Sequence, residues 1–393
     1  MHPFATFQPE IWILLTQAGG DNDQCLAFGE ALGRPTTVKR LDWPVADPVQ
    51  DRAVLRALLA DTPDAERRRN ALGLHSPWPR VVICCGRRSD RVAFWIKRQS
   101  GGRTRIVSVG RARLALSSYD LLVAPPHFPL PARANVVNLP LPMTRRRHGH
   151  DEQNARAPNP VVPVPKPWFT ILLGGEVKQF AACERRLVEA ARRAQAAANR
   201  HGGSVVVSTS RRTPPGLLAA IESVLDRPYI YRWSGSPGAE NPYEILLRDS
   251  ATLFVTADSA SMILDCCASG TPTYVIEYPQ RLDLRARWRR ALFDGFRRTV
   301  ESCRGWGLGP FADRLDRAQD WMHARRLVRY PRDLRRFHAS VYSMGFARPA
   351  TDFEPAVLPP ARTVANDLTE ISGVRTAAAR CLALSRTPLL AAE

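Results

Sequence analysis

The chain has 393 residues, 45% of them hydrophobic, so it is long enough for two ordinary domains with apolar cores and is not a disordered protein. Its formal net charge of +19 comes mostly from arginine, which supplies 52 of the 56 basic residues. This charge favours an anionic partner such as a membrane surface, unless it reflects only the codon usage of a GC-rich genome. A specific nucleic-acid partner is not expected, because the arginines are dispersed and lack interleaved aromatic residues.

No apolar run approaches the roughly 20 residues that a membrane span requires. The short IWILL run near the start lacks a basic flank and a cleavage site, so we expect a first strand there and not a signal peptide. A cytoplasmic protein follows, with a peripheral position on the inner face of the cytoplasmic membrane left open. The eight cysteines show no C-x-x-C spacing, which favours buried free thiols over a metal site or a disulfide framework.

The first half alternates short apolar runs with helical stretches, a pattern that predicts parallel strands in a doubly wound sheet. A glycine turn at 19–22 and a helix through about Leu32 follow the first strand, and a helix through about Gln99 follows the second. The expected strands of this half are EIWILLT (10–16), VVICC (81–85), RIVSVG (105–110), DLLVA (120–124) and NVVNL (135–139).

Residues 151–167 are rich in proline and lack periodicity, which is typical of an extended linker. We therefore predict a first Rossmann-like domain at 1–150, a second at 168–330 and C-terminal helices with a proline-rich extension at 331–393. The strands expected in the second domain are WFTILLGG (168–175), GSVVVST (203–209), YIYRW (229–233), ATLFVT (251–256) and TYVIEY (273–278). Two such domains facing a cleft form the GT-B architecture of many nucleotide-sugar glycosyltransferases.

The segment 235–279 carries the clearest site pattern. A buried strand ends at Thr256, Asp258 and Ser259 are helix N-cap candidates, and Gly270 ends the helix that follows. The turn at the carboxyl end of a parallel strand opens a ligand crevice, and free N–H groups at the helix start suit a phosphate or carboxylate. The segment therefore predicts a binding site for an anionic ligand.

Several motifs occur in the order found in one known family. They include KRLDW (39–43), GRRS (86–89), PPH (125–127), LLGGEVKQF (172–180), TSRRTPP (209–215), ENPY (240–243) and TADSASM (256–262). Together they resemble the mitochondrial fission "elongated mitochondria" family, which is similar to GT-B glycosyltransferases and whose plant members recruit a dynamin-related protein to mitochondria. This chain has Phe128 where the family usually has an acidic residue, and Leu264-Asp265 where the family usually has Ser-Glu.

The remaining candidates also follow strand ends. Gly174 and Gly175 either let backbone N–H groups approach a diphosphate or form a plain tight turn. Lys178, just beyond, either meets a phosphate or is solvated. A second group, Ser210, Arg211 and Arg212, combines a hydroxyl with guanidinium groups that could clamp a phosphate.

Two further clusters belong to the second domain. Glu240 and Asn241 precede Pro242 at a helix start, where Asn241 acts as the cap and both side chains could also face the cleft. Helical spacing places Asp258, Ser261 and Asp265 on one stripe. Resemblance to glycosyltransferases of this architecture, such as the enzyme making lipid II, implies that Asp265 binds the donor ribose. It also implies that Ser259 and Ser261 leave room for the diphosphate.

In the first domain, Asp21 is a candidate general base, with a capping role as its alternative, and His127 is a candidate proton-transfer group or a structural residue. The expected function is transfer of a sugar from a nucleotide-diphosphate sugar to an envelope lipid or polysaccharide, with the donor as co-substrate and no other cofactor. A non-catalytic scaffold that recruits a protein partner at a membrane, and a nucleotide-sugar epimerase, are the alternatives.

Overall fold

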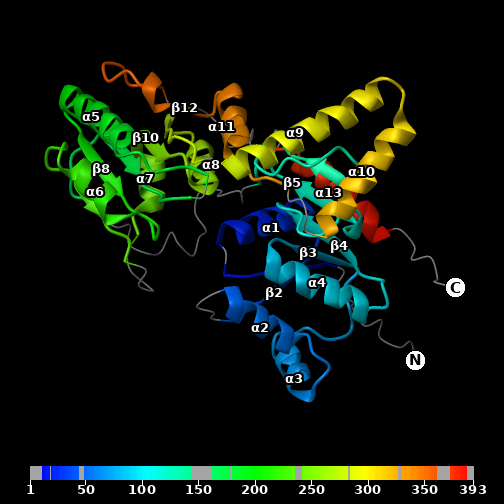
Figure 1. Ribbon diagram of the computed structural model, residues 1–393. Helices are drawn as coiled ribbons and strands as arrows, with labels where there is room; N and C mark the ends of the chain where they lie inside the picture. The colour runs from blue at the N-terminus through cyan, green and yellow to red at the C-terminus, as the bar shows by residue number, and fades with distance from the viewer. Residues whose placement is uncertain are drawn as a thin grey trace. The chain divides into compact units, whose positions relative to one another are not determined.

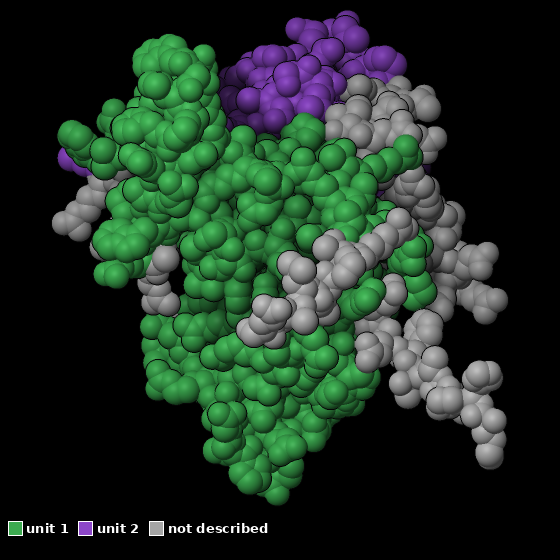
Figure 2. Space-filling model, turned by 90° about the vertical axis from the view of Figure 1, so that its right-hand side faces the viewer, with its two compact units in different colours: residues 1–145, 287–332, 369–393 green, residues 146–286, 333–368 purple. Residues whose placement is uncertain are grey.

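The computed structural model describes residues 11–17, 19–43, 48–143, 162–177, 179–234, 241–281, 284–325, 330–360 and 372–386. The chain divides into two compact units, which are coloured separately in Figure 2. Unit 1 comprises residues 1–145, 287–332 and 369–393, and unit 2 comprises residues 146–286 and 333–368. Each unit contains one six-stranded sheet, and the helices of each unit flank its own sheet (Figure 1).

The sheet of unit 1 is parallel throughout, in the order β2-β1-β3-β4-β5-β6. Its strands are β1 (Ile11–Leu15), β2 (Thr37–Arg40), β3 (Val81–Cys84), β4 (Arg105–Val109), β5 (Leu121–Ala124) and β6 (Val136–Asn138). The helices are α1 (Gly19–Ala31), α2 (Pro48–Leu58), α3 (Pro63–Ala71), α4 (Arg87–Gln99), η1 (Leu116–Ser118), α9 (Leu284–Gly305), α10 (Gly309–Ala324) and α13 (Val374–Arg386). Residues of α9 belong to this unit from Arg287 onward.

The central strands of unit 1 are apolar because both faces of the sheet are covered. Alternate residues of β1 enter different cores: Trp12 and Leu14 pack in one apolar cluster, and Ile13 and Leu15 pack in the other. This continuous burial explains why the strand reads as an unbroken hydrophobic run.

Unit 2 repeats the arrangement with the parallel order β12-β11-β10-β7-β8-β9. Its strands are β7 (Trp168–Leu172), β8 (Ser204–Ser208), β9 (Tyr229–Tyr231), β10 (Ser250–Thr256), β11 (Thr273–Ile276) and β12 (Arg348–Pro349). The helices are α5 (Glu184–His201), α6 (Pro215–Glu222), α7 (Tyr243–Asp249), α8 (Ala260–Ser269), α11 (Leu334–Ser343) and η2 (Ala350–Asp352). The predicted α/β class with two Rossmann-like units is confirmed.

Some elements differ from the prediction. Residues 19–22 are the first turn of α1, because Asn22 exchanges hydrogen bonds with Thr16 N at 2.9 Å and Thr16 O at 2.6 Å and fixes the helix start at the strand end. The short strands β2 and β12 were not predicted. The last helix, α13, begins at Val374, and residues 361–371 before it lie outside the described residues.

The units do not follow the predicted consecutive domains. Residues 287–332 belong to unit 1, because Phe293 and Tyr330 are buried in one of its apolar clusters. The predicted C-terminal extension is divided between the units, with α11 in unit 2 and α13 in unit 1. The described end of the predicted linker packs in unit 2, where Val162 is buried beside Trp168; residues 151–161 lie outside the described residues.

All eight cysteines lie in the described residues; none forms a disulfide, and all except Cys183 are buried. No helix in the described ranges is both long enough and apolar enough to cross a membrane.

Candidate functional site

Neighbouring strands of unit 2 end together at one edge of its sheet. β10, β7 and β8 are adjacent and parallel, so the loops that follow them begin side by side. These loops contain Gly174-Gly175, Ser210–Thr213 and Asp258-Ser259. The predicted site segments after these strands are therefore brought together.

Asp258 links these loops. It is only 1% exposed, and its carboxylate accepts hydrogen bonds from Gly175 N at 2.9 Å, Thr256 Oγ1 at 2.7 Å and Arg212 Nη2 at 3.2 Å. Burial raises the pKa of Asp258, whereas these donors and the positive charge of Arg212 act in the opposite direction. The carboxylate therefore binds its own loops instead of projecting into solvent.

The glycine pair makes this packing sterically feasible. A Cβ on Gly174 would lie 2.2 Å from Asp258 Oδ1, and a Cβ on Gly175 would lie 2.1 Å from Arg212 O. Gly174 N donates to Thr256 Oγ1 at 2.8 Å, so both glycine N–H groups are used within the protein. The structure gives the pair a role in close packing of the loops, in place of the expected direct approach to a diphosphate.

Hydroxyl groups in the loop after β8 bond to the glycine loop after β7. Thr213 Oγ1 donates to Gly174 O at 2.7 Å and accepts from Ser210 N at 2.8 Å. Ser210 Oγ also donates to Gly174 O at 3.2 Å. Thr213 and Thr256 were not among the predicted site residues, although both lie in the quoted motifs TSRRTPP and TADSASM.

Positive groups remain at the surface beside Asp258. Arg211 is exposed, and the side chain of Arg212 is 43% exposed despite its bond to Asp258. Ser259 is the N-cap residue of α8, but its side chain makes no capping hydrogen bond. The first N–H groups of an α-helix have no acceptor within the helix, so this end of α8 offers donors and a positive dipole end next to Arg212. The exposed Ser261 adds a hydroxyl, 3.3 Å from that of Ser259.

Asp265 lies further along α8 and is half-buried. Tyr243 Oη donates to Asp265 Oδ2 at 3.1 Å, which joins α7 to α8. Asn241 Oδ1 accepts from Tyr243 N at 3.1 Å, but the N-cap residue of α7 is Pro242, so Asn241 lies one residue before the cap position that was predicted for it. Glu240 and Lys178 lie outside the described residues.

Contacts with α11 stabilise the loop after β7 at the same edge of the sheet. Gln179 donates to Asp333 Oδ1 at 2.9 Å and accepts from Leu334 N at 3.0 Å, which ties the loop after β7 to the start of α11. His338 stacks on Phe180 with ring centroids 5.7 Å apart, and burial lowers its pKa to about 4. These supporting contacts join segments more than 150 residues apart, so no local sequence pattern could reveal them.

The candidates of unit 1 are spread along its sheet. Asp21 is half-buried in the first turn of α1, after β1, whereas His127 is buried after β5, with its ring 4.5 Å from that of Phe128. β3 and β4 lie between β1 and β5, so at about 4.8 Å per strand the two strand ends are about 14 Å apart. The sheet order therefore does not pair them as one acid–base couple.

The arginines after β3 form ion pairs and a ring contact with other residues of unit 1. Arg87 and Arg88 contact the carboxylate of Asp51 at 3.2 and 2.9 Å, and Arg88 also lies 4.2 Å from the Trp43 ring centroid. Binding of an acidic acceptor by these arginines would have to compete with these contacts.

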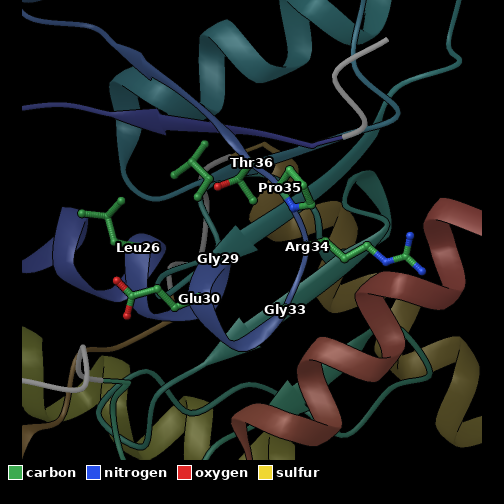
Figure 3. Close-up of a pocket in the computed structure, with 8 residues that line it drawn as sticks. Leu26, Gly29, Glu30, Gly33, Arg34, Pro35 and Thr36 are labelled. Carbon is green, nitrogen blue, oxygen red and sulfur yellow. The ribbon is translucent and has the colours of Figure 1, made fainter. Parts of the chain in front are cut away.

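A cavity of about 390 Å³ lies between α1 and the loop that leads to β2 (Figure 3). Leu26 and Thr36 line it, and Glu30 and Arg34 carry its charge. A loop from a helix into a parallel strand lies at the amino end of the sheet, whereas ligand crevices of open α/β sheets lie at the carboxyl end. This cavity is therefore separate from the candidate site.

The fold and the site define an α/β protein with two Rossmann-like units and a strand-end cluster of positive and hydroxyl groups in unit 2. A model of the family described as Mitochondrial fission ELM1 matches residues 19–308. The chain belongs to this family. The Mitochondrial fission protein ELM1 of Arabidopsis thaliana is 26% identical over 276 residues, which span 61% of this chain and 62% of that protein.

Two solved structures share a more distant similarity with the chain. MurG of Acinetobacter baumannii is 11% identical with a TM-score of 0.40, over 96% of this chain and 95% of that chain. The UDP-GlcNAc 2-epimerase of Methanocaldococcus jannaschii is 10% identical with a TM-score of 0.42, over 67% of this chain and 83% of that chain. These scores lie below 0.5, and the fold assignment rests on the sheet topology.

Proposed function

We propose that unit 2 binds the diphosphate of a nucleotide sugar and that the protein transfers the sugar to an envelope lipid or polysaccharide. The observation that carries this proposal is the uncapped start of α8 beside the half-exposed Arg212. A helix N-terminus and a guanidinium group together favour a phosphate, and both would stabilise the charge of a departing diphosphate.

We assign each residue a role from the hydrogen-bond donors, acceptors and charges that it presents. Arg212 is held by Asp258 and directs its remaining N–H donors to the diphosphate, with Arg211 as a second cation. The exposed Ser261 donates to a phosphate oxygen, and Asp265 accepts from the ribose hydroxyls while keeping its bond to Tyr243. The donor is the co-substrate, and the proposal includes no other cofactor.

The acceptor side is proposed for unit 1, with Asp21 as general base and His127 as a second proton-transfer group. An envelope-lipid acceptor would place the protein in the cytoplasm, at the inner face of the membrane.

A non-catalytic scaffold that recruits a protein partner is the second candidate. Membership of the ELM1 family favours it, and so does the use of both glycine N–H groups by side chains of the protein. A site whose backbone N–H groups already bond to protein side chains could keep its structure after catalytic activity has been lost. A nucleotide-sugar epimerase is a third candidate, and it would use the same donor site without an acceptor.

The test is a thermal-shift panel of UDP-, GDP-, CMP- and ADP-sugars on the full chain. Saturating ligand at about 100 times its Kd stabilises the protein by about 2.7 kcal/mol, which is readily detected. We expect Arg212→Gln to weaken binding about tenfold to a hundredfold, because a hydrogen bond to a charged group is lost. We expect Ser261→Ala and Asp265→Ala to weaken binding less.

The matched control is Arg200→Gln, which removes an exposed arginine near the C-terminal end of α5, at the opposite edge of the sheet. It should leave the ligand shift unchanged, and melting without ligand checks that each variant folds. No shift with any nucleotide sugar would exclude the donor site and favour the scaffold. Release of the nucleoside diphosphate only when an acceptor is present would separate transfer from epimerisation.

A further inference from the structure

The turn between α9 and α10 and one face of α10 expose an unusual set of large side chains. Trp306 is 76% exposed, Leu308 49%, Phe311 50% and Trp321 53%, and Arg314 and Arg325 are exposed between and beyond them. We call these six residues the α10 surface. Single exposed apolar residues are ordinary, but a contiguous group of this kind marks an interaction site.

The spacing places these residues together. Positions 311, 314, 318, 321 and 325 recur every three or four residues and therefore lie on one face of the helix. Arg325 lies 4.5 Å from the centroid of the Trp321 ring.

Buried contacts hold this surface in place. Val300 and Cys303 of α9 pack against Ala312 of α10 in a small apolar cluster. Asp320 accepts from Leu116 N at 3.0 Å and forms an ion pair with Arg133 at 2.6 Å, which fixes α10 to the rest of unit 1. The turn lies at the outer end of the helix pair in Figure 1. The exposed rings are therefore presented by a rigid support.

The acidic side chains of α10 do not belong to this face. Asp313 and Asp316 contact Arg304 at 3.5 and 2.5 Å, and Asp320 contacts Arg133. Arg314 and Arg325 form no ion pair within the part of the chain that the structure describes. The α10 surface is consequently apolar and positive, with no acidic side chain of α10 among its residues.

We propose that the α10 surface docks on a membrane that contains anionic lipids. Trp306, Leu308 and Phe311 enter the headgroup region, where the polar N–H edge of the Trp306 ring is favoured and the apolar side chains leave water, and Arg314 and Arg325 contact the lipid phosphates. The apolar turn favours a lipid surface over nucleic acid, because the aliphatic side chain of Leu308 cannot stack on a base. The net charge of +19 adds long-range attraction to such a surface.

This surface lies in unit 1 and uses none of the residues assigned to the nucleotide site. Membrane docking can therefore be present when nucleotide-sugar binding is absent, and the two proposals fail independently. If both hold, the α10 surface would bring the protein to a lipid-borne acceptor.

The test is co-flotation of the full chain with phosphatidylcholine vesicles that contain either no anionic lipid or about one-third phosphatidylglycerol. We expect binding only to the anionic vesicles, and weaker binding at 0.5 M salt because the arginine contacts are screened. The double variant Trp306→Ala/Phe311→Ala should bind at least about tenfold more weakly. Arg314→Gln and Arg325→Gln should each lower binding about fivefold.

Two controls match these changes. Trp233→Ala removes a 41% exposed tryptophan from unit 2, and Arg67→Gln removes an exposed arginine from α3; neither should alter binding. Quenching of Trp306 by brominated lipid, identified by its loss in Trp306→Phe, tests insertion without depending on the alanine variants. Equal binding by variants and wild type, or unquenched Trp306, would overturn the proposal. So would binding to a single-stranded oligonucleotide in place of vesicles.

Discussion

Asp258 shows how a residue chosen as a ligand contact can instead shape the loops around a site. It has seven-residue spacing to Asp265, and that spacing alone does not distinguish a solvent-facing carboxylate from a buried one. The contacts of Asp258 with Gly175 and Arg212 depend on loops that are 83 and 46 residues away in the chain, respectively. The presence of a site after β10 was predictable. Which of its residues hold the loops together and which face solvent was not.

Asp90 provides a prediction about pH. Its carboxylate is buried and accepts from Tyr119 Oη at 3.1 Å, and burial raises its pKa from 3.8 to about 6. The native state therefore holds a proton that the unfolded chain releases near pH 4, so this group's contribution to stability is lost as the pH rises through 6. One pKa unit corresponds to about 1.4 kcal/mol, which makes the contribution about 3 kcal/mol.

We expect the free energy of unfolding of wild type, relative to Asp90→Asn, to fall by about 3 kcal/mol between pH 4 and pH 7. Urea unfolding followed by tryptophan fluorescence measures this difference. Asp64→Asn changes an aspartate that is 59% exposed and should show no comparable trend. A parallel pH dependence in wild type and Asp90→Asn would contradict the assignment.

At the level of elements, one carboxylate of α10 joins the helix to three residues elsewhere in unit 1. Asp320 is 7% exposed and receives hydrogen bonds from Leu116 N and Ser117 N as well as from Arg133. Asp320→Ala leaves a nearly buried guanidinium and backbone donors without this acceptor. Removing one partner of such a buried pair costs about 3–5 kcal/mol.

We therefore expect Asp320→Ala to accelerate amide hydrogen exchange throughout α10, measured by mass spectrometry. Asp313→Ala is the control: its side chain is 59% exposed, and its contact with Arg304 contributes at most about 1 kcal/mol. If α10 keeps its protection in Asp320→Ala, the helix is held by its apolar contacts and not by this carboxylate.

The strands that were predicted and those that were missed differ in burial. β1, β3 and β10 are apolar and covered on both faces, so their sequences mark them without knowledge of the fold. β2 has the sequence TVKR with alternating half-buried and exposed residues, and β12 has only two residues. Both are edge strands, whose pairing depends on a neighbour and not on their own hydrophobicity.

For the molecule as a whole, the main difference between prediction and structure is that the two units are not continuous stretches of the chain. A sequence read from one end to the other favours consecutive domains, but unit 1 takes residues from three separate segments. The helix α13 illustrates the reason, since Val374, Ala377 and Cys381 complete the core that contains Phe28. Nothing local in that helix indicates which sheet it covers.

A chain that ends at residue 368 tests this division, because it removes α13 and leaves every segment of unit 2. Burial of a few apolar side chains contributes roughly 5 kcal/mol, so we expect unit 1 to lose most of its stability. Hydrogen exchange should become faster in β1 and β5 and remain slow in β7 and β10. Equal loss of protection in both units would show that they unfold as one cooperative body.

The interleaved chain also fixes an order of completion during synthesis. Domains usually fold from the N-terminus as the ribosome releases them. Here the unit that starts first finishes last, because its core requires Cys381, whereas unit 2 has all of its segments once residue 368 has emerged. The nascent first sheet must therefore wait, with one face incompletely covered, until Cys381 has left the ribosome.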